Sequence, residues 1–306
     1  MQLKILVEII TVLVALMLVG YIGARRGLFS PHITKAMSWL VFNIFLVSSV
    51  FASICDDVPD MSGSELMKIM GILSLCIILC YVIAIVVLRP IMRKKPSLPI
   101  GEICISAMNT LLFGLPIVQQ VYGSMAVLYM GLSSVPFNLF LYSYGTIRLC
   151  GKAEGQGFNI KRMFTPIFIA TIAALVVLFA RLPIPGVFNK YLDITAAATL
   201  PMSMIVLGAT MGAGNLAEAF KDKRVYIISF VRLVLCPLIV YLVLSPIAMD
   251  PILLRTAVVI AGCPCGVVVP VLALQFDHDA LFASRSVMAS TLLSVLTLPV
   301  VILLLG

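Results

Sequence analysis

Apolar runs of about 20 residues follow one another along the whole chain, separated by short charged loops. Each run has the length that an α-helix needs to cross a lipid bilayer. Of the 306 residues, 62% are hydrophobic and 11% are charged, a balance too apolar for a soluble domain. The sequence therefore predicts an all-α membrane protein with ten transmembrane helices. The predicted spans are residues 4–22, 33–53, 66–89, 99–121, 125–147, 163–181, 194–213, 225–246, 254–276 and 280–305.

Lysine and arginine gather in alternate loops. They follow the first, third, fifth and seventh spans, as at Arg93, Lys95, Arg148 and Lys221, whereas the loop after the second span is acidic. Because Lys and Arg favour cytoplasmic loops, this pattern predicts that the basic loops are cytoplasmic and that the N- and C-termini lie on the outer side. The basic residues do not alternate with aromatic ones, which argues against nucleic-acid binding.

Two spans carry helix-breaking and polar residues at matching positions. When the halves of the sequence are overlaid, Pro116 of the fourth span falls on Pro270 of the ninth. Because each half has an odd number of spans, the second half must be inserted upside down, as in the inverted repeats of transporters. We predict a first five-helix repeat at 1–149, a cytoplasmic linker at 150–162 and a second, inverted repeat at 163–306.

The interruptions themselves predict a binding site. Proline removes a backbone donor, and in lipid the freed backbone groups must find partners or line a cavity. If the two interrupted spans cross, their exposed amides meet inside the membrane together with the side chains of Asn109 and Thr110. Amides at helix N-termini favour anions. The sequence therefore predicts a site for a small organic anion such as a carboxylate.

The run NTLLFGLPI and the closing stretch FDHDALFASRSVMASTLLS resemble the auxin efflux carrier family. The short loop after the fifth span is similar to the bacterial branch, which contains malate and malonate permeases. The resemblance implies two inverted five-helix repeats with crossed, broken fourth and ninth helices, as in bile-acid symporters. It also implies a scaffold of spans 1, 2, 6 and 7, a transport bundle of spans 3–5 and 8–10 that moves like an elevator, and a homodimer.

The resemblance adds residues to the predicted site. Asn138 matches a polar position that faces the crossing in the family, and Thr291 matches a Ser-Thr pair that is frequent in it. Val47 stands where many members carry a proline in the second span. The predicted substrate-binding residues come from the fourth, fifth, ninth and tenth spans. They are Asn109, Thr110, Gly114, Pro116, Asn138, Cys263, Pro264, Cys265, Pro270 and Thr291.

Three further charged residues fall inside or at the ends of spans. Arg232 is expected either to snorkel to the lipid headgroups or to attract an anionic substrate. Arg285 is expected to pair with Asp277 and Asp279, or to act as an anion gate, and Glu102 is expected on a solvated face. Transport, if coupled, would use sodium or protons.

Three functional interpretations remain open on the sequence. The first is a secondary transporter or facilitator for a carboxylate such as malate. The second is a metal- or thiol-dependent transporter that uses Cys263-Pro264-Cys265, because soft thiolates suit Cu(I). The third is a membrane receptor that senses an anion without transporting it. No nucleophile elbow, metal-ligand spacing or dinucleotide fingerprint is found, so we expect neither an enzyme nor a bound cofactor or metal.

Overall fold

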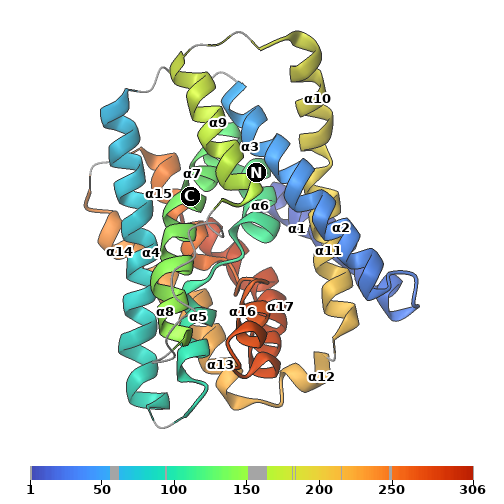
Figure 1. Cartoon of the computed structure of the whole chain (residues 1–306), viewed down its shortest axis with the longest axis vertical. Coiled ribbons are helices and arrows are strands. Elements are labelled where there is room, and N and C mark those ends of the chain that lie inside the picture. Colours follow the sequence, from blue (N-terminus) through green and yellow to red (C-terminus); the bar gives the residue numbers. More distant parts are fainter. Residues whose placement is uncertain are drawn as a thin grey trace. The chain divides into compact units, whose positions relative to one another are not determined.

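The structure is a computed structural model, and it describes residues 2–55, 62–93, 95–150, 164–180, 182, 184–214, 216–247 and 250–305. Every regular element within these ranges is a helix (Figure 1), which confirms the all-helical class. The predicted linker at 150–162 lies outside the described residues, apart from Cys150.

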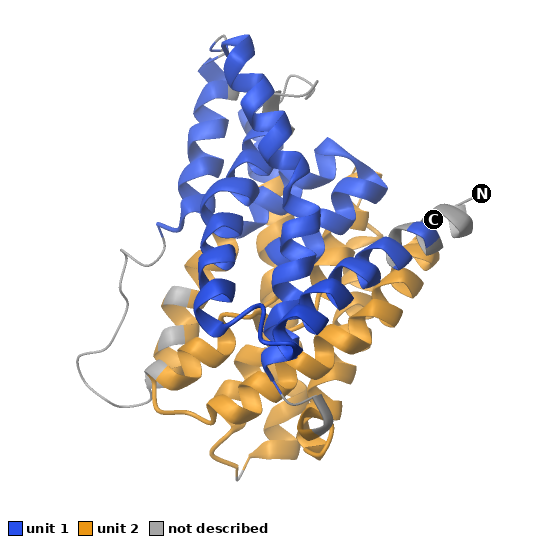
Figure 2. Cartoon of the chain, turned by 90° about the vertical axis from the view of Figure 1, so that its right-hand side faces the viewer, with its two compact units in different colours: residues 1–68, 111–134, 164–215 blue, residues 69–110, 135–163, 216–306 orange. Residues whose placement is uncertain are grey.

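The chain divides into two compact units, coloured in Figure 2. Unit 1 consists of Met1–Lys68, Leu111–Ser134 and Phe164–Asn215, and unit 2 consists of Ile69–Thr110, Val135–Met163 and Leu216–Gly306. Unit 1 therefore combines the predicted spans 1, 2, 6 and 7 with residues 111–134. The assignment of a scaffold and a mobile bundle remains a proposal.

The helices of unit 1 are α1 (Gln2–Arg25), α2 (Pro31–Leu40), α3 (Leu46–Cys55), α6 (Leu115–Tyr122), α9 (Pro166–Ala180), α10 (Gly186–Ala197) and α11 (Thr199–Ala213). A π-helical turn, η1 (Val41–Phe45), joins α2 to α3. Three elements continue from one unit into the other: α4 (Gly63–Met92), the π-helical turn η2 (Thr110–Gly114) and α7 (Ser124–Phe140).

Unit 2 contains α5 (Leu98–Ser106), α8 (Thr146–Cys150), α12 (Leu216–Ala219), α13 (Lys223–Phe230), α14 (Cys236–Leu244), α15 (Pro251–Gly262), α16 (Val269–Gln275) and α17 (Ala280–Leu305). Two more π-helical turns, η3 (Leu141–Gly145) and η5 (Val231–Leu235), precede α8 and α14.

Six helical stretches in the described part of the chain are long and apolar enough to cross a membrane. They are Pro31–Ala52, Gly63–Met92, Ser124–Leu149, Gly186–Ala213, Lys223–Leu244 and Ala280–Leu305. Shorter apolar helices cover Thr11–Arg25, Thr110–Tyr122, Pro166–Val177 and Pro251–Gly262, and each overlaps one of the other four predicted spans. The count of ten spans and the inverted repeat remain predictions.

In unit 1, α1 and α11 are in backbone contact through glycines. A Cβ atom added to Gly208 would lie 1.9 Å from the carbonyl oxygen of Met17, and one added to Gly20 would lie 2.0 Å from that of Ile205. A Cβ atom added to Gly212, one turn after Gly208, would lie 2.6 Å from the carbonyl oxygen of Tyr21. Small residues spaced by four allow membrane helices to approach this closely.

In unit 2, a buried carboxylate joins the ends of α4, α5 and α8. Glu102 is 0% exposed and accepts a hydrogen bond from Nε of Arg148 at 2.6 Å. The guanidinium of Arg89 lies 3.6 Å from its other oxygen. The prediction of a solvated Glu102 is therefore wrong, because two arginines from neighbouring helix ends pair with it and offset part of the cost of its burial.

Candidate functional site

The two interrupted segments contact each other within unit 2. Helix α5 ends at Ser106 and α15 ends at Gly262. Beyond these ends, Met108 and Cys265 form an isolated antiparallel β-bridge. The N–H of Asn109 donates to the carbonyl of Pro264 at 2.9 Å, and the N–H of Gly266 donates to the carbonyl of Ala107 at 2.8 Å. We call residues 107–109 and 264–266 the break contact.

The break contact leaves two helical carbonyls without their usual donors. Ile260 would normally receive a hydrogen bond from the residue four positions later, but that residue is Pro264, which has no N–H. Ile105 would receive one from Asn109, whose N–H instead donates to Pro264. Ile260 keeps a bond from the N–H of Cys263, at 3.3 Å, and both carbonyls can take a side-chain donor in place of the missing one. Such a donor is favoured here, because unsatisfied backbone groups are very unfavourable away from water.

Arg232 supplies these donors. Its Nη1 donates to the carbonyl of Ile105 at 2.8 Å, its Nη2 to that of Ile260 at 2.9 Å and its Nε to that of Cys263 at 2.7 Å. The side chain is 0% exposed, so the prediction that it snorkels to the headgroups is wrong. A guanidinium suits this position because it carries several donors in one rigid plane and complements helix C-termini.

The local sequence places Arg232 in the π-helical turn η5, directly before α14. Pro237 in the first turn of α14 cannot donate to the carbonyl of Leu233, which accounts for the local widening of the helix. The same arrangement recurs at η2, which precedes Pro116 in α6. Such π-helical turns inside α-helices are frequent at functional sites.

The polar residues predicted to bind substrate are buried in unit 2. Asn109 and Thr110 follow α5 and are 4% and 5% exposed, Asn138 on α7 is 6% exposed, and Thr291 on α17 is 0% exposed. Among these predicted residues, two side-chain atoms are buried without a hydrogen-bond partner, Nδ2 of Asn109 and Oγ1 of Thr291. Next to Thr291, Oγ of Ser290 accepts the N–H of Cys265 at 3.1 Å. The unsatisfied amide of Asn109 is therefore a buried donor at the break contact that a ligand could use.

The remaining predicted residues lie further along the chain from the break contact. Gly114 ends η2 and Pro116 lies in the first turn of α6, and both belong to unit 1. Pro270 lies in the first turn of α16 and is half-buried. Asn109, Pro264 and Cys265 are thus the predicted residues that the backbone bonds bring together.

Cys263 and Cys265 are both buried thiols. The side chain of Cys265 lies next to that of Cys104 on α5. Within the described ranges, no group of three or more His, Cys, Asp or Glu side chains is arranged to hold a metal ion. Nothing in this geometry favours the metal-dependent interpretation.

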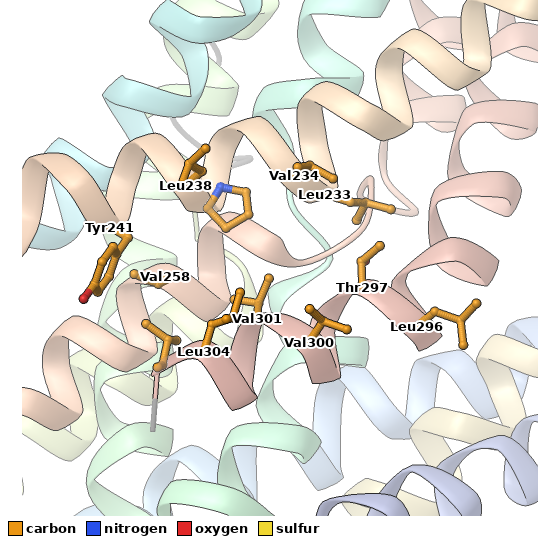
Figure 3. A pocket seen from close by; sticks show the side chains of 12 residues that line it. Leu233, Val234, Leu238, Tyr241, Val258, Leu296, Thr297, Val300, Val301 and Leu304 are labelled. Carbon is orange, nitrogen blue, oxygen red and sulfur yellow. The ribbon is translucent and has the colours of Figure 1, made fainter. Parts of the chain in front are cut away.

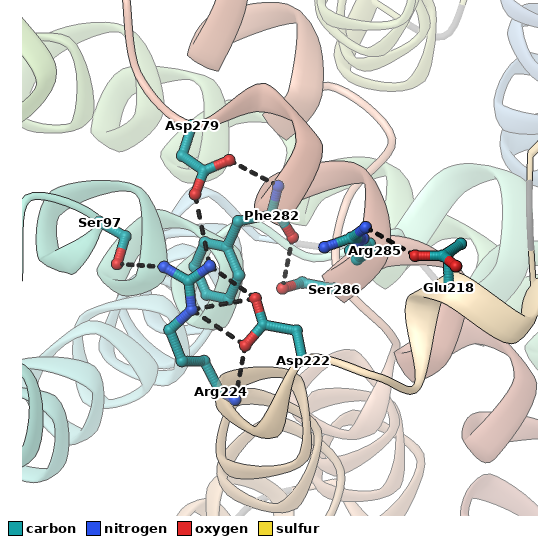
Figure 4. A network of polar contacts seen from close by, with 8 residues as sticks. All are labelled: Ser97, Glu218, Asp222, Arg224, Asp279, Phe282, Arg285 and Ser286. Atoms are coloured by element: carbon teal, nitrogen blue, oxygen red, sulfur yellow. Dashed lines mark hydrogen bonds and ion pairs between the residues drawn. The ribbon is translucent and has the colours of Figure 1, made fainter.

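A polar network joins the starts of α5, α13 and α17 (Figure 4). The guanidinium of Arg224 pairs with Asp222, donates to Oγ of Ser97 at 2.8 Å and lies 3.4 Å from Asp279. It also covers the ring of Phe282, 4.2 Å from the centroid. Asp222 accepts hydrogen bonds from Arg224, and these hold the pKa of its carboxyl below the usual range.

Arg285 has a different partner from the one predicted. Its Nη2 donates to Glu218 of α12 at 3.1 Å, and Figure 4 shows this pair beside the Arg224 network. The predicted pairing of Arg285 with Asp277 and Asp279 is therefore wrong. Asp279 instead caps α17, where it accepts the N–H of Phe282 at 2.9 Å.

An apolar groove of about 560 Å³ lies between α14, α15 and α17 (Figure 3). Its walls include Leu238, Val258, Val301 and Leu304, and none of the predicted substrate-binding residues lines it. A groove without charged side chains offers nothing to neutralise a carboxylate. We therefore do not assign the anion site to it.

Comparisons with known proteins identify the family. A family model described as membrane transport protein matches residues 5–159 and 155–302. Uncharacterized transporters of Methanothermobacter thermautotrophicus and Methanocaldococcus jannaschii are 26% and 23% identical, each over 95% of this chain and 96% of the relative. A candidate malonate transporter of Rhizobium meliloti is 32% identical over 44% of this chain and 42% of its own. The chain is therefore a multi-pass membrane transporter that belongs to the membrane transport protein family, the family of the auxin efflux carriers.

Proposed function

We propose that the protein transports a small organic anion, a carboxylate such as malate or malonate, across the membrane. The observation that carries this proposal is the break contact, where two helix interruptions meet beside an unsatisfied buried amide, Nδ2 of Asn109. The candidate malonate transporter among the relatives supports the same class of substrate. In this proposal the amide of Asn109 donates to the carboxylate of the guest.

The proposed mechanism is alternating access by an elevator-like movement of the transport bundle against the scaffold, in a homodimer. The grouping of residues 1–68 with 164–215 in one compact unit supports a scaffold built from both halves of the sequence. The Arg232 hydrogen bonds hold both interruptions within unit 2, so they would move as one body. Broken helices that meet at the substrate are common in secondary transporters.

The test is uptake of labelled malonate into proteoliposomes by the Asn109→Ala variant. We expect uptake to fall to background, while size-exclusion chromatography shows the same folded species. Asn43→Ala is the matched control, because the amide of Asn43 already donates to the carbonyl of Trp39 in its own helix. If Asn109→Ala transports malonate as well as Asn43→Ala does, the site assignment is wrong.

The thiol-dependent alternative has its own test. Replacing both Cys263 and Cys265 by Ser removes the sulfur atoms but keeps small polar side chains at the break contact. We expect malonate uptake to survive this change largely intact. Loss of uptake, together with its dependence on a soft metal ion in the wild type, would favour the alternative.

A further inference from the structure

Two charged side chains are fully buried in the part of the chain that the structure describes, Glu102 and Arg232. Glu102 has a counter-charge, because Arg148 pairs with it at 2.6 Å. Arg232 donates its hydrogen bonds to backbone carbonyls, and no carboxylate of the described residues forms an ion pair with it. Its positive charge is therefore surrounded by backbone dipoles and thiols, with no carboxylate of the described residues beside it.

A buried charge of this kind is unfavourable in the empty protein. Carbonyl dipoles offset part of the loss of hydration, but a buried ion normally also needs an ionic partner. The titratable groups that face Arg232 are thiols, Cys80 of α4, Cys236 of α14, and Cys263 and Cys265 of the interruption. A negatively charged guest would supply the missing counter-charge.

The charge of Arg232 lies close to the proposed binding residue. The carbonyl of Cys263 accepts from its Nε, and the carbonyl of the next residue, Pro264, accepts the N–H of Asn109. The carbonyl that accepts from the guanidinium and the carbonyl that accepts from the backbone of Asn109 therefore belong to consecutive residues. At such short range inside a protein, a unit charge acts strongly on a bound ion.

We propose that Arg232 is the positioning residue that sets the charge selectivity of the break contact, favouring a guest that binds with one negative charge. Such a guest is a monocarboxylate or the singly ionised form of a dicarboxylate. A second negative charge would enter the same buried region without an ionic partner there. This inference rests on the proposed function and specifies the substrate of that same site.

Direct binding measurements on the purified full-length protein test the inference. Monomethyl malonate carries one negative charge wherever its carboxyl is ionised, so its dissociation constant should not change across the pH range in which malonate loses its second proton. The apparent dissociation constant of malonate should rise over that range, and above the second pKa of malonate it should rise by about tenfold for each pH unit, because the singly ionised fraction falls in that proportion.

The outcomes separate this inference from the proposed function. If malonate binds as tightly or more tightly once both carboxyls are ionised, the single-charge inference is wrong, although carboxylate transport still stands. If neither ligand binds at any pH, the proposed function itself fails.

Variants of Arg232 distinguish its charge from its role in holding the backbone. Arg232→Gln keeps amide donors but removes the charge, whereas Arg232→Lys keeps the charge with fewer donors. We expect Arg232→Gln to lose the preference for monomethyl malonate over neutral dimethyl malonate by about tenfold or more. Arg232→Lys should retain that preference. Equal losses for both ligands in both variants would mean a purely structural role and would overturn the inference.

Two control variants complete the experiment. Arg285→Gln removes an arginine that is already paired with Glu218, so the preference for the anion should stay unchanged. Cys80→Ser should also leave it unchanged within about twofold, since the guest and not a thiolate is the counter-charge. A larger change in Cys80→Ser would assign the counter-charge to the thiol and refute the proposal. Should Arg232→Gln fail to fold, the pH comparison on the unmodified protein still decides.

Discussion

The contact between α1 and α11 gives a sharp prediction for the substitution Gly208→Ala. The added Cβ would lie 1.9 Å from the carbonyl oxygen of Met17 and 2.7 Å from its carbonyl carbon. Ordinary contact begins at 3.4 Å, so relief requires a separation of 3.4 − 1.9 = 1.5 Å. The obstacle is backbone, which cannot rotate away as a side chain can. Overpacking costs about 1–3 kcal/mol, and we expect about 3 kcal/mol here.

The net effect includes a gain in helix propensity of about 1 kcal/mol when alanine replaces glycine. We therefore expect Gly208→Ala to lower the free energy of unfolding by about 2 kcal/mol. Equilibrium unfolding by sodium dodecyl sulfate in mixed micelles measures this quantity. The matched control is Gly71→Ala in α4, where an added Cβ meets nothing within 4 Å and stability should stay equal or rise. Equal stability of the two variants would refute the packing argument.

Two further substitutions test the charged groups of unit 2. Glu102→Gln should lower the free energy of unfolding by about 1–3 kcal/mol, because it leaves Arg148 unpaired. Arg148 is 27% exposed, so this loss is smaller than for a fully buried pair. The same micelle assay measures it. No loss would mean that the Glu102 pair contributes nothing. Asp222→Asn should destabilise the protein at neutral pH, where the carboxylate accepts from Arg224. Because folding lowers the pKa of Asp222, the difference in unfolding free energy between Asp222→Asn and wild type should shrink below about pH 4 and vanish below the folded-state pKa. Unfolding curves at a series of pH values measure this difference. A difference that does not change with pH would contradict the prediction.

Local chemistry explains why much of the fold could be predicted. The last apolar run, 280–305, coincides with α17, and the run 163–181 contains α9. The interruption after Gly262 follows from Pro264, whose effect on a helix does not depend on distant residues. The interruption in the fourth predicted span lies at residues 107–109, whereas Gly114 and Pro116 lie within the continuous helical stretch Thr110–Tyr122. The predicted seventh span starts at residue 194, inside α10 (Gly186–Ala197), because Asn189, Lys190 and Asp193 make the first part of this helix too polar for an apolar run.

Long-range partners explain what the sequence could not reveal. Arg232 was expected to reach the headgroups, but its acceptors are 28 to 127 residues away and are backbone carbonyls, which have no side-chain signature. Glu102 and Arg148 are separated by 46 residues. In helices that are apolar all round, periodicity does not show which way a polar residue faces. The one local signal is the proline that follows each of two π-helical turns, Pro116 and Pro237.

The hydrogen bond from Arg232 to Ile105 also bears on how the protein is made. Ile105 belongs to the first half of the chain and Arg232 to the second, so the ribosome completes α5 well before the donor exists. During that interval the carbonyl of Ile105 lacks its eventual partner, and the interrupted fourth segment cannot take its final form within lipid. We therefore expect the amino-terminal half to reach its final structure only once the carboxy-terminal half has been inserted.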